Sequence, residues 1–266
     1  MTTKTDAKGT ALITGASSGI GAEFARRLAA RRHRLLLVAR REDRLRALAE
    51  ELLREYGVSV EVLRADLSKG SDIERLRLRA AELDDLEILV NNAGFGTRGR
   101  FVGMDPQKQH DMITLHIIAS AVLARSVLPR MIARGRGAII NVSSVAAFFP
   151  LRGNATYSAT KAYLNAFTEA LHTELIGTGV RVQALCPGFT LTEFHATPEY
   201  AGLNVRARVP GFMWMTAGQV VGESLRALER GKVICIPGRR YRLLTRIGRL
   251  GPVAEIRKLV AARLRR

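Results

Sequence analysis

The chain has 266 residues, of which 47% are hydrophobic and 25% are charged, so it can bury a sizeable core as one α/β domain or at most two small ones. Its two cysteines, Cys186 and Cys235, lie in apolar runs and are too few for a disulfide framework or a zinc site. We expect both to be small buried side chains, and we expect no metal. The polar start from Met1 to Gly9 has no signal-peptide pattern, and no apolar run of about 18 residues predicts a spanning helix, so we expect a cytoplasmic protein.

The net charge of +18 is concentrated at the C-terminus. From Gly231 to Arg266 there are 11 basic residues and one acid, Glu255, which gives +10. The rest of the chain has 31 basic and 23 acidic residues, which gives +8. The excess is therefore a local feature and not a property of the whole surface.

Short apolar runs alternate with longer helical patterns along the chain. Several runs are continuously apolar, which is typical of strands that are buried on both faces. The expected strands are Thr10–Thr14, Arg34–Ala39, Val58–Ala65, Glu87–Asn91, Gly137–Ser143, Val180–Cys186 and Lys232–Ile236. This alternation predicts a doubly wound, Rossmann-type parallel sheet of about seven strands, with helices on both faces and right-handed crossovers.

Three segments between these runs have helical spacing. Glu42–Tyr56 places leucines on one face among charged residues, and Pro106–Ala133 begins at an Asp105-Pro106 start. Asn154–Ile176 is apolar on more than one face, so it either lies deep in the protein or forms a subunit contact. A subunit contact there would make the protein an oligomer.

The first expected strand leads directly into a glycine-rich turn, Thr14-Gly15-Ala16-Ser17-Ser18-Gly19-Ile20-Gly21, followed by a helix. A helix N-terminus offers unpaired N–H groups to a pyrophosphate, and glycines allow the backbone to approach it closely. The spacing G-x-x-x-G-x-G differs from the more familiar G-x-G-x-x-G. Its position after the first strand predicts a dinucleotide site.

The end of the second strand indicates which dinucleotide is bound. An acid there would bind a ribose 2′-hydroxyl, whereas this strand ends in Ala39-Arg40-Arg41. A guanidinium binds phosphate through charge-assisted bonds, so we expect Arg40 to contact a 2′-phosphate, with Arg41 in support. Asp66, after the third strand, either accepts a bond from adenine or caps the next turn.

Tyr157 and Lys161 lie four residues apart in Tyr157-Ser158-Ala159-Thr160-Lys161 and thus share one face of a helix. A nearby cation favours the phenolate, so we expect the Tyr157 phenol to exchange a proton near neutral pH. Ser144 follows the expected strand that ends at Ser143. Because ligands bind beyond the carboxyl ends of parallel strands, these groups should meet the glycine turn at one sheet edge.

These segments together resemble the standard, single-domain branch of the short-chain dehydrogenase/reductase family. The motifs are TGASSGIG, NNAG, NVSS, YSATK and PGFTLT, which lie in order between Thr10 and Ile236. The resemblance implies hydride transfer between a nicotinamide and a carbonyl or secondary alcohol, and it implies a homodimer or a homotetramer. Arg40 predicts that the cofactor is NADP(H) rather than NAD(H). It implies that Tyr157 is the general acid/base, that Lys161 binds the ribose and lowers the pKa of Tyr157, and that Ser144 binds the substrate oxygen.

The resemblance also assigns the cofactor contacts. Asn92, Ala93 and Gly94 would line the adenosine–ribose side, and Thr190 or Thr192, after Pro187-Gly188, would bind the nicotinamide carboxamide. The cofactor-binding residues that we expect are Gly15, Ser17, Ser18, Gly19, Ile20, Gly21, Arg40, Arg41, Asp66, Leu67, Asn92, Ala93, Gly94, Tyr157, Lys161, Pro187, Gly188, Thr190 and Thr192.

One position departs from the family pattern. The family usually has an asparagine that holds a water in the proton relay to the lysine, and His116 occupies that place in Met112-Ile113-Thr114-Leu115-His116-Ile117. The change is mild if a backbone carbonyl binds the water. Otherwise the imidazole joins the relay, or the relay is impaired and the protein is a weakly active or inactive nucleotide-binding sensor or scaffold.

Residues 1–237 are expected to form one dinucleotide-binding and catalytic domain, with a substrate lid at about 188–215. The aromatic residues and methionines of the lid favour a lipophilic substrate over a sugar, or else they pack as a satellite core. Residues 238–266 should form a basic, helical extension. The extension either contacts an anionic membrane surface or packs on the domain or on a second subunit, and no motif predicts a nucleic-acid partner.

Overall fold

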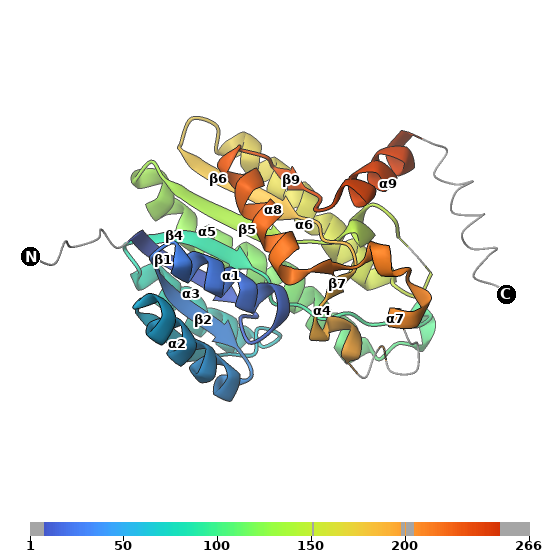
Figure 1. Ribbon diagram of the computed structural model, residues 1–266, viewed down its shortest axis with the longest axis horizontal. Helices are drawn as coiled ribbons and strands as arrows, with labels where there is room; N and C mark the ends of the chain where they lie inside the picture. Colours follow the sequence, from blue (N-terminus) through green and yellow to red (C-terminus); the bar gives the residue numbers. More distant parts are fainter. Residues whose placement is uncertain (1–7, 151, 198–199, 201–204, 251–266) are drawn as a thin grey trace, which may run out of the picture.

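The structure, a computed structural model, describes residues 8–150, 152–197, 200 and 205–250. Its centre is a seven-stranded parallel sheet with the order β3-β2-β1-β4-β5-β6-β9 (Figure 1). The strands are β1 Lys8–Thr14, β2 His33–Ala39, β3 Val60–Arg64, β4 Leu86–Asn91, β5 Gly137–Val142, β6 Val180–Leu185 and β9 Ile234–Cys235. All seven expected strands are confirmed, although β9 is shorter than its apolar run.

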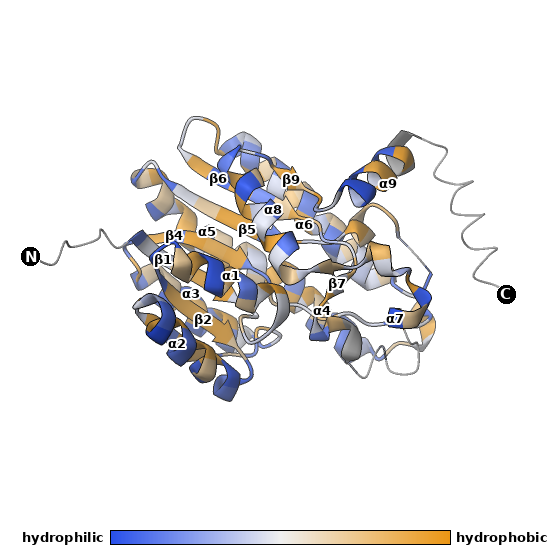
Figure 2. Cartoon of the chain, viewed as in Figure 1, coloured by the Kyte–Doolittle hydropathy of each residue, from blue (hydrophilic) through white to orange (hydrophobic). Residues whose placement is uncertain are grey.

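Helices cover both faces of the sheet. One core layer includes α1 (Gly19–Ala30), α2 (Glu42–Tyr56) and α8 (Ala217–Glu229). The opposite layer includes α3 (Gly70–Glu82), α5 (Ala119–Ala133) and α6 (Ala155–Glu174). Neighbouring side chains of β2 alternate between the two layers, as the pleat of a strand requires, and Figure 2 shows the apolar strands enclosed by helices with hydrophilic outer surfaces. The doubly wound architecture is confirmed.

The segment Pro106–Ala133 is not the continuous α-helix that its pattern predicts. It consists of α4 (Pro106–Ile113), a π-helical turn η2 (Thr114–Ile118) and α5. A π turn holds one residue more than an α turn, so it rotates the flanking residues relative to each other. The whole segment is apolar and long enough to cross a membrane by composition alone, but buried side chains such as Leu123 and Met131 place it in the protein core.

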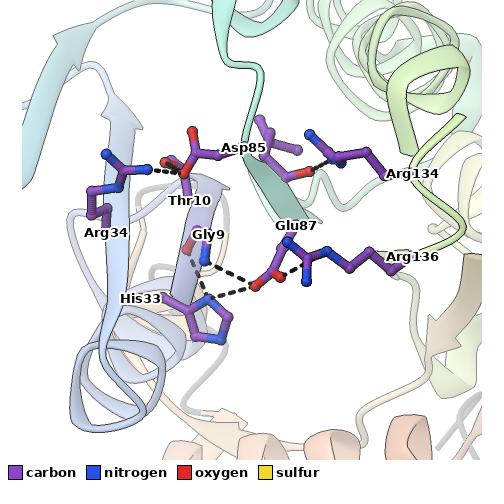
Figure 3. A network of polar contacts seen from close by, with 9 residues as sticks. Gly9, Thr10, His33, Arg34, Asp85, Glu87, Arg134 and Arg136 are labelled. Atoms are coloured by element: carbon purple, nitrogen blue, oxygen red, sulfur yellow. Dashed lines mark hydrogen bonds and ion pairs between the residues drawn. The ribbon is translucent and has the colours of Figure 1, made fainter. Parts of the chain in front are cut away.

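A polar network holds the amino-terminal ends of β1, β2 and β4 together (Figure 3). The Thr10 hydroxyl donates to Asp85 at 2.8 Å, and Asp85 also pairs with Arg34. The backbone N–H of Gly9 donates to the Glu87 carboxylate at 3.1 Å, while its carbonyl contacts Nδ1 of the buried His33 at 2.9 Å. These contacts lie at the sheet edge opposite the glycine turn and are therefore structural.

The long connection after β6 contains short elements. They are β7 (Thr190–Leu191), η4 (Glu193–Ala196), α7 (Val205–Arg208), η6 (Gly211–Met213) and β8 (Met215–Thr216). A further short helix, η3 (Val145–Ala147), lies between β5 and α6. Strands β7 and β8 pair in parallel, which brings the two ends of the connection after β6 together. The C-terminal extension begins as the expected helix, α9 (Arg239–Leu250), and its remainder, 251–266, lies outside the described residues together with 198–199 and 201–204 of the lid.

Candidate active site

The glycine turn between β1 and α1 leaves no room for a side chain at Gly15 or Gly21. Gly15 and Gly19 have φ values of +66° and +57°, which favour glycine. A Cβ at Gly15 would lie 2.8 Å from Cα of Ala93, and one at Gly21 would lie 2.3 Å from the Gly15 carbonyl oxygen. The side chain of Ser18, the residue before α1, does not cap the helix, so the N–H groups of the first turn can bind an anion.

Asn92 fixes the shape of this turn. Its Nδ2 donates to the carbonyl oxygens of Thr14 at 2.9 Å and Gly15 at 3.2 Å. The Thr14 hydroxyl accepts from the backbone N–H groups of Asn92 and Ala93, each at 3.0 Å. The segment after β4 thus lies beside the turn as expected, but the Asn92 side chain is already engaged by the protein.

Arg40 lines a cavity of about 390 Å³ beside the turn. Its walls are Arg40, Arg64, Ala65, Asp66, Lys69, Asp72 and Arg75. Arg40 is exposed, and four of these seven residues are basic, so the cavity suits a phosphate group. Oδ1 of Asp66 accepts from the backbone N–H of Ser68 at 3.1 Å and from its hydroxyl at 2.8 Å, which matches the capping interpretation.

Arg41 has a different environment from Arg40. It donates to the hydroxyls of Ser17 and Ser18 at 3.0 and 2.8 Å, and to the Glu193 carboxylate at 2.8 Å. Arg44 donates to the other carboxylate oxygen of Glu193 at 2.5 Å. Hydrogen bonds from Arg41 and Arg44 lower the pKa of Glu193, so this carboxylate is charged. Arg41 therefore joins the glycine turn to the start of the lid.

Ser144, Tyr157 and Lys161 meet at the carboxyl end of β5. Ser144 lies immediately before η3 and hydrogen-bonds to Tyr157. Nζ of the buried Lys161 donates to the Val142 carbonyl at 2.8 Å and lies 5.7 Å from the centroid of the Tyr157 ring. Ser143 donates its hydroxyl to the Lys161 carbonyl at 2.8 Å, which ties α6 to β5. The three residues thus lie together where the sequence predicts.

The pKa values at this site differ from the expectation. We expected the Lys161 ammonium to lower the pKa of Tyr157, but burial raises the pKa of this phenol, and the Ser144 hydrogen bond opposes the rise only in part. Tyr157 keeps some solvent-accessible area but is packed among protein atoms on most sides. Burial also lowers the pKa of Lys161 to about 7, so a rise in pH through neutrality removes its charge. Desolvation is the largest cause of both shifts.

His116 lies in the π turn and is buried, with 1% of its surface exposed. Nε2 accepts from the Phe95 backbone N–H at 3.2 Å. Nδ1 lies 2.9 Å from the Thr160 hydroxyl, which itself donates to the Tyr157 carbonyl at 2.9 Å. These partners assign the neutral tautomer with the proton on Nδ1. Burial, followed by the positive charge of Lys161, holds the pKa of His116 well below its usual value.

The imidazole of His116 therefore links the loop after β4 to α6 through both of its nitrogens. Its ring centroid lies 5.9 Å from that of Tyr157 and 6.1 Å from that of Phe95. The hydrogen-bond chain from His116 ends at the backbone carbonyl of Tyr157 and not at its phenol. This geometry is that of a positioning residue. It favours neither an imidazole that takes part in the proton relay nor an impaired relay.

Comparison with known proteins identifies the family of this chain. The family model described as short chain dehydrogenase matches residues 9–199. The chain belongs to the short-chain dehydrogenase/reductase family. A short-chain dehydrogenase from Sphingobium yanoikuyae in complex with NADPH is 39% identical, with a TM-score of 0.81 over 96% of this chain and 93% of that chain.

Two further similarities bear on activity. The bulky-bulky ketone specific alcohol dehydrogenase from Comamonas testosteroni is 34% identical, with a TM-score of 0.78 over 91% of this chain and 93% of that chain. The inactive hydroxysteroid dehydrogenase-like protein 1 of Homo sapiens is 35% identical over 193 residues. That match covers 71% of this chain but only 58% of the human protein.

Aromatic side chains of the lid pack against Tyr157 and against one another. The Phe194 ring lies 6.0 Å from Tyr157 and 5.7 Å from Tyr200, and the Phe189 ring lies 5.4 Å from that of Trp214. Phe194 and Tyr200 therefore form an aromatic cluster with Tyr157, while Phe189 and Trp214 form a separate pair.

The sequence did not reveal that α9 braces the lid. The hydroxyl of Tyr241 accepts from the Phe189 N–H at 2.9 Å and donates to the Met213 carbonyl at 2.6 Å, so it joins both ends of the lid. A Cβ at Gly188 would lie only 1.9 Å from the Tyr241 ring. Glu193 and Thr160 were missed as well. Only Thr160, inside the YSATK motif, gave any signal in the sequence.

Proposed function

We propose that this dehydrogenase is an NADP(H)-dependent oxidoreductase that interconverts a lipophilic carbonyl compound and its secondary alcohol. The observation that carries the proposal is the meeting of Ser144, Tyr157 and Lys161 at the sheet edge that also bears the glycine turn. Acid/base groups beside a dinucleotide site are the arrangement that hydride transfer to a carbonyl requires.

The residues present fit NADP(H). The first turn of α1 and its glycines would hold the pyrophosphate, and Arg40 in its basic cavity would hold the 2′-phosphate. The related structure from Sphingobium yanoikuyae contains NADPH, which supports this choice. Arg41 donates to Glu193 and to the two serines, and its supporting role at the 2′-phosphate stays a prediction.

The bound nicotinamide would supply the hydride for reduction, and the chain would handle the proton. Because its raised pKa keeps Tyr157 protonated at neutral pH, its phenol can donate a proton to the substrate oxygen. Ser144, hydrogen-bonded to Tyr157, would orient the same oxygen. The buried Lys161 ammonium would stabilise the phenolate that forms, and Val142 holds it in place.

A lipophilic substrate is proposed because Phe194, Tyr200 and Phe95 supply apolar surface around Tyr157 and His116. The Comamonas testosteroni relative, described as specific for bulky-bulky ketones, supports the same substrate class. A homodimer or homotetramer stays a prediction, which size-exclusion chromatography with light scattering would test. A cytoplasmic location also stays a prediction.

A second candidate is a nucleotide-binding scaffold with little turnover. The human relative described as inactive favours it. The intact set of Ser144, Tyr157 and Lys161 argues against it, since binding alone does not require an acid/base group.

The test is NADPH oxidation with a panel of bulky aromatic and alicyclic ketones. Tyr157→Phe should lower kcat by about 100-fold or more and leave NADPH affinity within a few-fold of the parent. Tyr163→Phe, which changes an exposed tyrosine on the same helix, is the control and should retain activity. Tight NADPH binding without turnover of any ketone would support the scaffold instead.

A further inference from the structure

Helix α9 presents two different faces. Tyr241 and Thr245 are 5% and 3% exposed and fasten the helix to the lid and to its own preceding turn. On the outer face, Leu243, Leu244 and Ile247 are 60%, 45% and 51% exposed. Three large aliphatic side chains on one solvated helix face form an apolar stripe that nothing in the described part of the chain covers.

Basic side chains flank this stripe. The sequence Arg239–Leu250 contains no acid, and Figure 2 shows hydrophilic and hydrophobic residues alternating around α9. Arg242 pairs with Glu223 at 2.8 Å. Within the described side chains of the helix, Arg239, Arg240 and Arg246 are exposed and make no ion pair with an acid. Their charge is therefore available to a partner.

The apolar surface continues onto the lid. Phe212 is 60% exposed, and the Arg240 guanidinium lies 4.9 Å from its ring centroid while donating to its backbone carbonyl at 2.6 Å. Phe212 is consequently held beside α9, and an exposed aromatic ring joins the aliphatic stripe. Figure 1 shows α9 standing out at the same end of the molecule as the lid helix α7.

We propose that α9, together with Phe212, docks this protein on an anionic lipid bilayer. The guanidinium groups would pair with lipid phosphates while the leucine and isoleucine side chains enter the acyl boundary, which is how basic amphipathic helices bind membranes. A second copy of this chain fits less well, because two such faces would bring like charges together. A nucleic acid would satisfy the arginines but would leave the aliphatic stripe in water.

The proposal does not rest on the proposed reaction, and its test measures binding alone. Full-length protein is sedimented with vesicles of phosphatidylcholine, with or without phosphatidylglycerol. We expect binding only to the anionic vesicles. Arg239→Gln with Arg246→Gln should weaken it by about 30-fold, since each basic residue near such a surface contributes roughly fivefold. Leu243→Ser with Ile247→Ser should weaken it by about tenfold or more.

The matched control is Leu53→Ser with Arg54→Gln, an exposed leucine and arginine on α2 at the far end of the molecule. It should bind as the parent does, and all variants should keep the parent's thermal midpoint. Three results would overturn the proposal: no sedimentation with anionic vesicles, equal loss in the control, or a concentration-dependent dimer that the Leu243 and Ile247 changes abolish. Loss on changing Arg263, Arg265 and Arg266 to Gln, with none in the α9 variants, would also overturn it.

Discussion

His116 offers the sharpest test of the site geometry. His116→Ala removes the acceptor for the Phe95 N–H and the donor to the Thr160 hydroxyl, at 3.2 and 2.9 Å, and leaves a cavity in a buried place. Two lost hydrogen bonds at about 1 kcal/mol each, together with the cavity, predict a loss of about 2–4 kcal/mol in the free energy of unfolding. For a chain of this size that corresponds to a fall of roughly 10 °C in Tm.

The assay combines thermal unfolding with the pH dependence of kcat. Because the pKa of His116 is held well below its usual value, the imidazole stays neutral across the working range and should contribute no inflection to the profile. The variant should therefore be less stable and slower, with an unchanged profile shape. His110→Ala, an exposed histidine of α4, should change neither stability nor rate.

The opposite pattern would refute the reasoning. If His116→Ala kept the parent's Tm but lost an acid inflection of the profile together with most of kcat, the imidazole would be part of the proton relay. Its two hydrogen bonds would then not be the reason for its place in the site.

Three further predictions follow from contacts elsewhere in the molecule. Arg40→Ala should weaken NADPH binding by about tenfold or more and leave NADH binding nearly unchanged, whereas Arg41→Ala should weaken the binding of both cofactors alike. Isothermal titration measures the affinity for each cofactor. An equal loss of NADPH and NADH affinity in Arg40→Ala would contradict the phosphate assignment. Tyr241→Phe removes the hydroxyl that joins the two ends of the lid, so the KM for the ketone should rise. Urea unfolding should show a loss of about 1–2 kcal/mol in the free energy of unfolding. An unchanged KM would show that the lid does not depend on α9. Burial lowers the pKa of His33, so the folded state favours the neutral imidazole. The contribution of His33 to stability is therefore present above the unfolded pKa of about 6.5 and is lost as pH falls below it. His33→Gln should reduce the acid-induced fall in Tm, and a parallel fall in the parent and the variant would exclude His33 as its cause.

The sheet and the meeting of the catalytic groups could be predicted from sequence because local patterns encode them. Continuous apolar runs predict the seven strands. The rule that ligands bind beyond strand carboxyl ends predicts that Ser144 and Tyr157 lie together. The glycine turn was equally readable, since only glycine tolerates the backbone of Gly15 and its closeness to Ala93.

The remaining features depend on contacts between residues far apart in the chain. No local pattern pairs Arg41 with Glu193, 152 positions later, or seats Tyr241 against Gly188. The pKa of Tyr157 was predicted in the wrong direction because spacing reveals the nearby lysine but not the depth of burial. The two bonds of His116 required the π turn, which leaves no signature in the hydropathy pattern.

That π turn makes the site sensitive to chain length at a single place. In a regular helix each residue advances about 100° around the axis, so one additional residue in a turn changes which way everything on either side of it faces. The extra residue allows His116 to point towards Phe95 and Thr160 while Leu123 and Met131, farther along, still face the sheet. Deleting one residue between Thr114 and Ile118 would restore an ordinary α-helix. Either Leu123 and Met131 would then lose their packing in the core, or His116 would lose its two hydrogen bonds. A one-residue deletion at this position should therefore be less well tolerated than any single substitution there.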